Sequence, residues 1–379
     1  MQRTNFPGSN RDDGVVFKIG NHAYCGTGQT PSFQPEKDFY SFEVFTGAWS
    51  QISSLPTNEG RQYASAFTND TLGFVFGGEN GSDFYNDLFA YDPNTDNWTE
   101  MTPLPSSGRS GMACFTIENK AYIICGRTSN TNLTKEVWEY NMTNDTWTQK
   151  NDFSFGKRWR MIGAVNNQSG FTLFGYDDTQ DFSDELFEYI PSTDDWVVRS
   201  NFPEEPRNYA VMTSINDHLV ILFGIDSTSQ FYNDVHLFDF TTDQWSTSTS
   251  LPDLPRRGGL VFSKGLDLFY TTGLTETPER TNETWLLTNP TSNLSEFKTD
   301  KISIYPNPAS DILNVKCSNC NNKPQTVTIK TLLGQHVSTF QINETHMKIN
   351  VSELSTGTYV LSIMSQSNQP ISPIRFVIK

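Results

Sequence analysis

The chain has 379 residues, of which 13% are aromatic and 18% are charged. This aromatic content is enough for a sizeable core and argues against a disordered chain. The 27 basic and 43 acidic residues give a net charge of −16, which argues against nucleic-acid binding and against electrostatic docking on an anionic membrane.

The first 297 residues carry a repeat with a period of 49 residues. Tryptophans stand at positions 49, 98, 147, 196 and 245. Arginines and glycines keep the same period through six cycles, at Arg11, Arg61, Arg109, Arg158, Arg207 and Arg256, and at Gly28, Gly77, Gly126, Gly175, Gly224 and Gly273. A repeat of about 50 residues predicts a propeller or a solenoid built from small supersecondary units.

Each repeat has the pattern of strands. In the second repeat, apolar runs at residues 62–67, 72–76 and 88–91 are separated by turn signals, and Trp98 opens a fourth run. Four short strands with turns every 8–12 residues predict one antiparallel sheet. Six such sheets arranged radially make a propeller, which protects most strand edges.

Residues 1–7 fit the same register. Pro56, Pro105, Pro203 and Pro252 each follow a repeat tryptophan by seven residues, and Pro7 would follow a tryptophan just before Met1. We therefore expect residues 1–7 to close the sixth blade as its fourth strand. We also expect this chain to lack residues at its start.

These repeats resemble kelch repeats. The resemblance is carried by the arginine before the first strand, the glycine that ends the second strand, and an aromatic residue seven positions before the tryptophan: Phe42, Tyr91, Tyr140, Tyr189 and Phe238. It implies an all-β, six-bladed kelch β-propeller over residues 1–297. The sixth repeat departs from the pattern, with Leu287 and Leu294 at the two aromatic positions.

The composition changes after a short linker at residues 298–301. Residues 302–379 carry three acids and six bases, a net charge of +3, which leaves −19 on residues 1–301, and all eight tryptophans precede residue 302. Apolar and polar residues alternate in short runs in this segment. The pattern predicts a small C-terminal β-sandwich.

The C-terminal segment resembles the sorting domain (type A) of proteins exported by the type 9 secretion system of Bacteroidetes-like bacteria. The motif residues are Tyr305, Pro306, Asn307, Pro308, Gly334, Gly357 and Tyr359. The resemblance implies that residues 302–379 are recognised by the secretion translocon and a sortase, and that the protein is secreted or displayed on the outer-membrane surface. It also implies a signal peptide, which residues 1–7 do not provide because they lack a basic region followed by an apolar stretch.

Cys317 and Cys320 form a C-x-x-C pair in this segment. Without a second pair or a nearby histidine, a zinc site is disfavoured. A local disulfide and two free thiols remain the two interpretations.

Arginines are the main candidate ligand-binding residues. The repeat arginine of kelch propellers lies at the face where the central funnel opens, where guanidinium groups could bind carboxylates or sulfates. The candidates are Arg11, Arg61, Arg109, Arg158, Arg160, Arg207, Arg256 and Arg257. The alternative is that each repeat arginine bonds backbone carbonyls and serves the fold alone. Arg160 and Arg257 are additional to the repeat, which makes each of them more suggestive of a ligand contact.

The sequence leaves the function open among three classes. The first is a secreted or surface kelch module whose funnel binds a glycan or a protein. The second is a sugar isomerase of the sialic-acid mutarotase type, for which Glu204, Glu205 and Arg207 are the catalytic candidates. The third is a non-catalytic scaffold or adhesin. No two histidines have ligand spacing, so neither a metal nor another cofactor is expected, and a copper oxidase is disfavoured.

Overall fold

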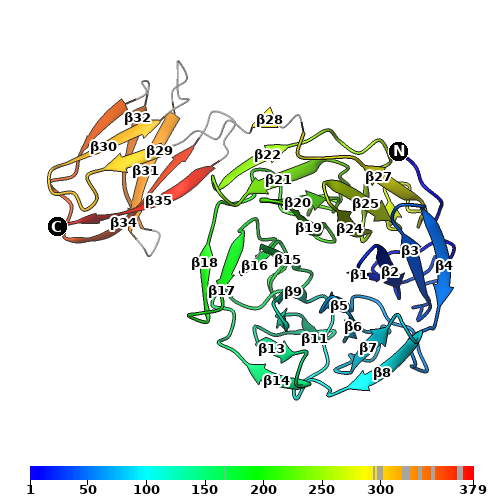
Figure 1. Ribbon diagram of the computed structural model, residues 1–379. Coiled ribbons are helices and arrows are strands. Elements are labelled where there is room, and N and C mark those ends of the chain that lie inside the picture. Colours follow the sequence, from blue (N-terminus) through cyan, green and yellow to red (C-terminus); the bar gives the residue numbers. More distant parts are fainter. Residues whose placement is uncertain are drawn as a thin grey trace. The chain divides into compact units, whose positions relative to one another are not determined.

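The computed structural model describes residues 1–166, 168–292, 295–296, 302–317, 325–331, 335–342, 346–364 and 370–379 (Figure 1). Regular elements among these residues are all strands, which confirms the all-β class. The described residues contain no helix long and apolar enough to cross a bilayer. The chain divides into two compact units, residues 1–296 and residues 297–379.

Residues 1–296 form six antiparallel sheets around a central axis (Figure 1). The innermost strand of each sheet lies beside that of the next, and the sixth contacts the first. The expected six-bladed propeller is therefore confirmed. Blades 1 to 3 contain β1 (Val15–Ile19), β2 (His22–Gly26), β3 (Phe39–Glu43) and β4 (Ala48–Ile52); β5 (Ser65–Thr68), β6 (Gly73–Phe76), β7 (Leu88–Asp92) and β8 (Asn97–Met101); and β9 (Ala113–Ile117), β10 (Lys120–Ile124), β13 (Val137–Asn141) and β14 (Thr146–Gln149).

The remaining blades continue this order, with small additions. Blades 4 to 6 contain β15 (Ile162–Asn166), β16 (Ser169–Leu173), β17 (Phe187–Ile190) and β18 (Asp195–Val198); β19 (Val211–Ile215), β20 (His218–Leu222), β21 (Val235–Asp239) and β22 (Gln244–Thr247); and β24 (Leu260–Lys264), β25 (Asp267–Thr271) and β27 (Thr284–Leu287). The additions are the hairpin of β11 (Arg127–Ser129) and β12 (Asn132–Leu133), the pair β23 (Arg256–Arg257) and β26 (Leu274–Thr275), and β28 (Ser295–Glu296), which pairs with β22.

The first residues of the chain lie along the outer edge of the sixth blade. Gln2 bridges Trp285 of β27, and the backbone nitrogen of Arg3 donates to the carbonyl of Thr284 at 2.8 Å. Phe6 is completely buried and packs edge-on against Trp49 of blade 1, whose indole N–H donates to the carbonyl of Thr4. The N-terminal segment thus contacts both the sixth and the first blade.

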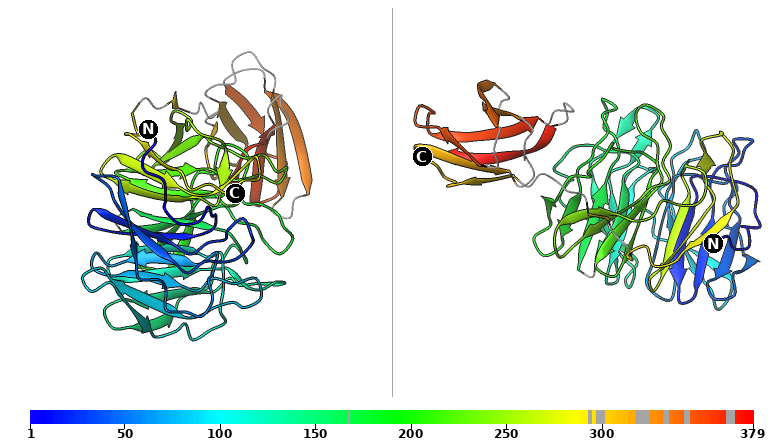
Figure 2. Two further views of the ribbon diagram at one scale, coloured as in Figure 1. Left: turned by 90° about the vertical axis from the view of Figure 1, so that its right-hand side faces the viewer. Right: turned by 90° about the horizontal axis from the view of Figure 1, so that it is seen from above.

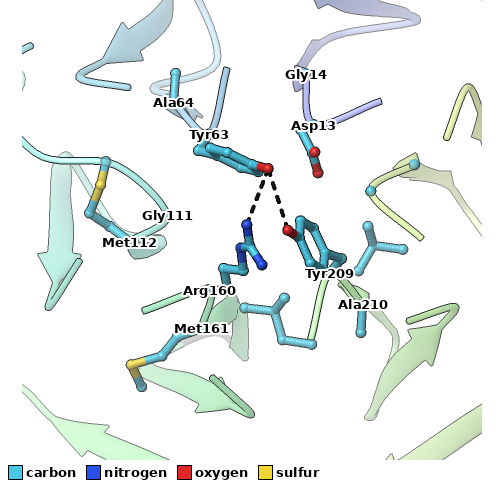
Figure 3. A pocket seen from close by; sticks show the side chains of 14 residues that line it. Asp13, Gly14, Tyr63, Ala64, Gly111, Met112, Arg160, Met161, Tyr209 and Ala210 are labelled. Atoms are coloured by element: carbon cyan, nitrogen blue, oxygen red, sulfur yellow. Dashed lines mark hydrogen bonds between the residues drawn. The ribbon is translucent and has the colours of Figure 1, made fainter. Parts of the chain in front are cut away.

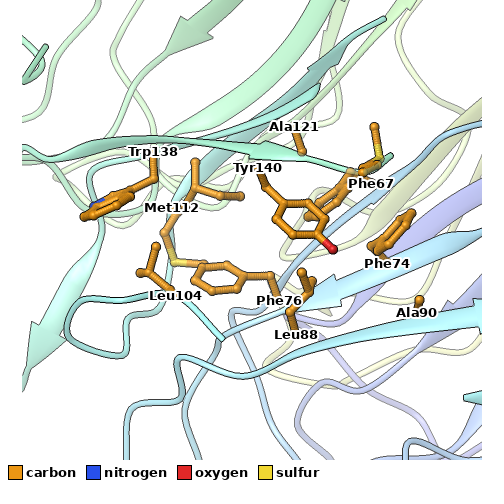
Figure 4. Close-up of a cluster of buried hydrophobic side chains, with 12 residues drawn as sticks. Phe67, Phe74, Phe76, Leu88, Ala90, Leu104, Met112, Ala121, Trp138 and Tyr140 are labelled. Carbon is orange, nitrogen blue, oxygen red and sulfur yellow. The ribbon is translucent and has the colours of Figure 1, made fainter. Parts of the chain in front are cut away.

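The core of the propeller lies between neighbouring sheets. Figure 4 shows one such layer, in which Phe74, Phe76 and Leu88 of blade 2 face Trp138 and Tyr140 of blade 3. All five side chains are at least nine-tenths buried. Burying aromatic faces between adjacent sheets is the main stabilising contribution in such a ring, because each blade alone would expose both of its faces.

The C-terminal unit is a sandwich of two sheets, which Figure 2 shows from two directions. One sheet has the order β29 (Ile302–Tyr305), β30 (Ile312–Cys317), β33 (His346–Asn350). The other has the order β32 (His336–Ile342), β31 (Gln325–Thr331), β34 (Gly357–Met364), β35 (Pro370–Ile378). Leu313 and Ile349 of the first sheet share a buried cluster with Ile329, Leu361 and Phe376 of the second.

Candidate functional site: the axial pocket

The residue two positions after each repeat arginine has the same unusual backbone in all six blades. These six residues, which we call the axial ring, are Asp13, Tyr63, Gly111, Arg160, Tyr209 and Gly258, with φ between 53° and 63°. In five of them the backbone N–H donates to the carbonyl of the preceding ring member at 2.7–3.0 Å. A left-handed backbone costs a non-glycine residue about 1 kcal/mol or more, so four side chains are held on the axis at a cost to stability.

The two glycines of the axial ring make room for their neighbours. A Cβ on Gly258 would lie 2.4 Å from Oδ1 of Asp13, and a Cβ on Gly111 would lie 2.2 Å from the indole nitrogen of Trp159. Any larger residue at either position would displace one of these side chains. The four large side chains and the two glycines of the axial ring therefore together determine the shape of the cavity at the axis.

The four side chains of the axial ring line a cavity of about 190 Å³ (Figure 3). Arg160 donates through Nη2 to the hydroxyl of Tyr63 at 3.2 Å, and the hydroxyls of Tyr63 and Tyr209 lie 3.5 Å apart. Asp13 projects into the pocket from blade 1, opposite blade 4, which carries Arg160. We call this cavity the axial pocket.

Arg160 lies in the middle of a stacked column of alternating guanidinium groups and aromatic rings. Its Cζ is 3.8 Å from the ring centroid of Trp159 and 3.6 Å from that of Tyr209. On the far sides of these two rings stand Arg127, 3.7 Å from Trp159, and Arg257, 4.0 Å from Tyr209. Each cation–aromatic contact of this kind is attractive, so the column fixes the orientation of Arg160.

The two outer guanidiniums of the column have carboxylate partners and the central one has none. Arg127 contacts Glu79 at 2.7 Å, and Arg257 lies 3.6 Å from both Asp12 and Asp13. Among the described residues, no carboxylate lies within ion-pair distance of Arg160, and its Nε–H is buried without an acceptor. Because both faces of Arg160 are stacked, only its N–H edge can receive an anion.

Asp13 is a buried carboxyl group in this cationic surrounding. Its pKa is raised to about 8, chiefly by burial and secondly by the neighbouring Asp12 carboxylate, against the opposite effect of Arg257, Arg160 and the Tyr63 hydroxyl. Burial also raises the pKa of the Tyr63 hydroxyl well above its usual value, with Asp13 adding to the shift. At neutral pH the pocket therefore presents neutral donors on one side and a guanidinium on the other.

Five of the six repeat arginines lie inside the blades. Arg11, Arg61, Arg109, Arg207 and Arg256 are 0–1% exposed, and each forms an ion pair with an acid that precedes the third strand of its own blade: Asp38, Asp87, Glu136, Asp234 and Glu283. Arg61, for example, also donates to the carbonyl of Gly77 at 2.8 Å. This placement supports the structural alternative for these five residues, and we leave them out of the proposed site.

The sixth repeat arginine and the two additional arginines have other surroundings. Arg158 forms no pair with Glu185, the acid at the equivalent position, and its closest carboxylate is Asp177 at 3.9 Å. Arg257 is held by Asp12 and Asp13 beside the pocket. Of the eight candidate arginines, only Arg160 lines the axial pocket.

The catalytic candidates lie elsewhere. Glu204 is 43% exposed and stands 3.9 Å from the buried Arg207, and neither Glu204 nor Glu205 lines the axial pocket. Glu204, Asp234 and His236 bring potential metal ligands within 4.8 Å of one another. Asp234, however, accepts two hydrogen bonds from Arg207 and one from His236, so we assign this cluster to the arginine ion pair.

Comparisons with known proteins agree with this architecture. The model of the KLHDC2/KLHL20/DRC7 Kelch-repeats domain matches residues 2–160, and the Kelch motif matches residues 206–252. The Secretion system C-terminal sorting domain matches residues 303–379. The chain therefore carries kelch repeats in its propeller and an export-system sorting domain at its C-terminus. Its sorting domain is that of the type 9 secretion system of Bacteroidetes-like bacteria, which points to secretion or display on the cell surface.

A solved structure reported as "Structure of YjhT" shares the kelch fold. It is 15% identical in sequence, with a TM-score of 0.67, and the match covers 78% of this chain and 99% of that one. At this identity the likeness shows the fold alone. No curated protein matches the chain.

The sorting motif of the kelch protein lies at the C-terminal strand of the sandwich. The side chain of Asn307 accepts a hydrogen bond from the backbone N–H of Val377 at 2.9 Å. The backbone N–H of Ala309 donates to the carbonyl of Val377 at 2.8 Å, and that of Lys379 donates to the carbonyl of Ala309 at 3.0 Å. Tyr305 is half-exposed, whereas Tyr359 is buried and stacks on Phe376. Pro306 and Pro308 flank Asn307 in the same bend, and Gly357 begins β34. Gly334 and Cys320 lie outside the described residues, as does the side chain of Cys317.

Reasoning from the sequence missed most of the pocket. It named Arg160 but not Asp13, Tyr63, Tyr209 or Trp159. The position two residues after the repeat arginine does change among Asp, Tyr, Gly and Arg, but the position directly after the arginine changes as well, so the variation did not single out the pocket.

Proposed function

We propose that the exported propeller is a binding module for an acidic ligand, a glycan or part of a protein, whose anionic group enters the axial pocket and is held by Arg160. The observation that supports this most is the state of the Arg160 guanidinium. It is oriented by stacking on both faces, lies on the axis, and has no carboxylate partner among the described residues. A guanidinium held in this way can bind an oxyanion edge-on through two parallel N–H groups.

The net charge of the domain and the volume of the axial pocket together limit which ligands can enter. Residues 1–301 carry a net charge of −19, so a large polyanion is repelled by most of the surface. A cavity of about 190 Å³ accepts one sugar-sized acidic group rather than a folded partner. Because Tyr209 is stacked between Arg160 and Arg257, the ring of Tyr63 is the axial-ring tyrosine that can contact the rest of that group, as in other small-ligand sites.

Calorimetric titration of the full chain with D-glucuronate, with D-glucose as the neutral comparison, tests this function. We expect glucuronate to bind and glucose not to bind. Arg160→Met should weaken glucuronate binding at least tenfold, because it removes a charge-assisted pair of hydrogen bonds. Arg158→Met is the matched control, since it removes the same charge two residues earlier without touching the pocket. Equal binding of glucuronate by the unaltered protein and both variants would show that Arg160 does not hold the ligand, and would contradict the proposed site.

A sugar isomerase is the second candidate. Glu204 and Glu205 do not line the axial pocket, and the buried acid that faces the pocket is Asp13. A carboxyl group with a pKa near neutrality can exchange a proton with a bound sugar. Exchange NMR of N-acetylneuraminate anomers tests this candidate. Acceleration that is lost in Asp13→Asn and retained in Glu204→Gln would support it, and no acceleration would exclude this substrate.

A further inference from the structure

We propose that Asp13 and Arg160 form a proton-linked site for a monocarboxylate, in which the ligand's carboxylate lies between the guanidinium edge and the protonated Asp13 side chain. This inference rests on the proposed function, because it names the ligand group and the second residue that binds it. A proton-linked site differs from simple anion binding by an arginine in one measurable effect. Binding of the ligand should take up a proton.

The geometry places the two residues on opposite sides of one pocket. Asp13 belongs to blade 1 and Arg160 to blade 4, which lie across the axis from each other, and both side chains line the axial pocket (Figure 3). They do not form an ion pair with each other among the contacts of the described residues. An anion between them would meet a guanidinium on one side and the Asp13 carboxyl on the other.

The surroundings of Asp13 decide which form of the carboxyl can accept an anion. The groups that face it are Asp12 from its own segment, Tyr63 from blade 2, Arg160 from blade 4 and Arg257 from blade 6. Asp12 is completely buried and is itself bound by Arg280 through Oδ1 at 2.5 Å. Because Asp13 is buried and adjoins Asp12, a negative charge on Asp13 is disfavoured, and a further charge on the ligand would disfavour it more.

A protonated Asp13 removes this conflict. Its O–H can donate a hydrogen bond to the ligand carboxylate, while Arg160 supplies two N–H donors from the other side. The raised pKa of Asp13 in the empty pocket agrees with this arrangement, and a bound anion raises that pKa further. By linkage, the affinity is constant where Asp13 is already protonated and falls as the pH rises above the pKa of the empty pocket.

The glycine of blade 6 supports the same interpretation. A Cβ on Gly258 would lie 2.4 Å from Oδ1 of Asp13 and 3.1 Å from its Cγ, so glycine here permits the carboxyl to occupy its place in the pocket. Asp13 shares its left-handed backbone, with φ of 59°, with the other members of the axial ring, and this backbone holds its side chain on the axis. A residue kept at such a position despite the strain is a candidate for a role in binding.

The test is calorimetric titration of the full chain with sodium acetate and with D-glucuronate across about pH 6 to about pH 9.5, in two buffers of different ionisation enthalpy. We expect constant affinity up to about pH 7, and a fall that approaches tenfold per pH unit above about pH 8. At about pH 8.5 the difference between buffers should report uptake of roughly one proton or somewhat less per carboxylate bound. Tighter binding of glucuronate than of acetate would assign the remaining contacts to a sugar ring.

Asp13→Asn separates this inference from the proposed function. The amide keeps a donor and removes the titration, so this variant should bind glucuronate at all of these pH values without proton uptake, and more tightly than the unaltered protein at about pH 9. Arg160-dependent binding that is independent of pH, or proton uptake that persists in Asp13→Asn, would overturn the proton linkage and leave the proposed function standing. Inorganic phosphate that binds as tightly as acetate would overturn the assignment of a monocarboxylate. Absence of binding by both carboxylates would overturn both proposals.

Discussion

Arg61 and Asp87, 26 residues apart, form a two-point ion pair inside the second blade. Nη1 contacts Oδ1 at 2.6 Å and Nη2 contacts Oδ2 at 2.9 Å, while Nη1 also donates to the carbonyl of Gly77. The pair ties the segment before the first strand to the end of the second and the start of the third. In five of the six blades the repeat arginine therefore joins parts of its own blade, which supports a structural reason for its period.

Removing the acid of this pair should destabilise the propeller. Asp87→Asn leaves the guanidinium of Arg61, which is 1% exposed, without a counter-charge. We expect the free energy of unfolding to fall by roughly 3 kcal/mol, because an uncompensated buried charge costs more than the pair contributes. Urea denaturation followed by tryptophan fluorescence measures the change, since all eight tryptophans lie in the propeller. The exposed Asp83→Asn on the same blade is the control, and an equal effect of both variants would contradict this explanation.

A second prediction concerns the contact between the first and last blades. In blades 2 to 4 an aspartate stands two residues before the repeat tryptophan, at Asp96, Asp145 and Asp194. It has a left-handed backbone and accepts a hydrogen bond from the preceding blade, as Asp96 does from the backbone nitrogen of Ser53 at 2.9 Å. Blade 1 has Gly47 at this position, with φ of 71° and open space where a Cβ would lie. Its counterpart to Ser53 is Thr4 of the N-terminal segment.

Gly47→Asp should therefore supply the missing inter-blade hydrogen bond. Aspartate tolerates the left-handed backbone better than most residues, and the new acceptor lies opposite the Thr4 backbone. We expect Gly47→Asp to be more stable than Gly47→Ala by about 1 kcal/mol, the contribution of one such bond. Thermal unfolding of the two variants makes the comparison. If alanine were as stable as aspartate, the carboxylate would have no role in joining the blades.

The N-terminal segment gives a third prediction. Removal of residues 1–7 would expose the outer edge of β27 and leave the space of Phe6 empty. We expect a clearly lower melting temperature for the shortened chain. Phe6→Ala, which keeps the strand pairing, should cost about 3 kcal/mol through the cavity that it leaves. A shortened chain with an unchanged melting temperature would show that the segment does not contribute to closing the ring.

Asp13 gives a pH dependence with a definite sign. Its pKa rises from the ordinary value of 3.8 to about 8 in the folded protein, so between these values the folded state holds a proton that the unfolded state releases. The contribution of this group to stability is therefore complete below the lower value and is lost as the pH rises toward the higher one. Asp13→Asn should gain stability relative to the unaltered protein between about pH 5 and about pH 8.5, as measured by thermal unfolding at each pH. A constant difference would contradict the raised pKa.

The sequence predicted the blades because the residues that build them are periodic. Tryptophan recurs in five of the six repeats, and five of the six repeat arginines have the same kind of partner, so the same side chain is needed in most blades. The acids that bind the arginines also keep a spacing of 26 or 27 residues, at Asp38, Asp87, Glu136, Asp234 and Glu283, and this spacing explains why the arginines recur.

The axial pocket could not be predicted in the same way. Its members share a backbone conformation rather than a side chain, and a left-handed φ at Tyr63 or Arg160 has no signature in a single sequence. The stacking of Arg160 between Trp159 and Tyr209 also joins two blades, a relationship that depends on how adjacent sheets face each other. Local pattern therefore located the arginine, and only the packing of blades 4 and 5 showed what surrounds it.

A crystal structure of the full chain with D-glucuronate tests the central claim most directly. We predict that the carboxylate lies edge-on to Arg160, with its oxygens about 3 Å from the guanidinium nitrogens and within hydrogen-bond reach of Asp13. The sugar ring should then lie against Tyr63. Glucuronate bound at another face of the propeller, with the edge of Arg160 unoccupied at a saturating concentration, would contradict the account.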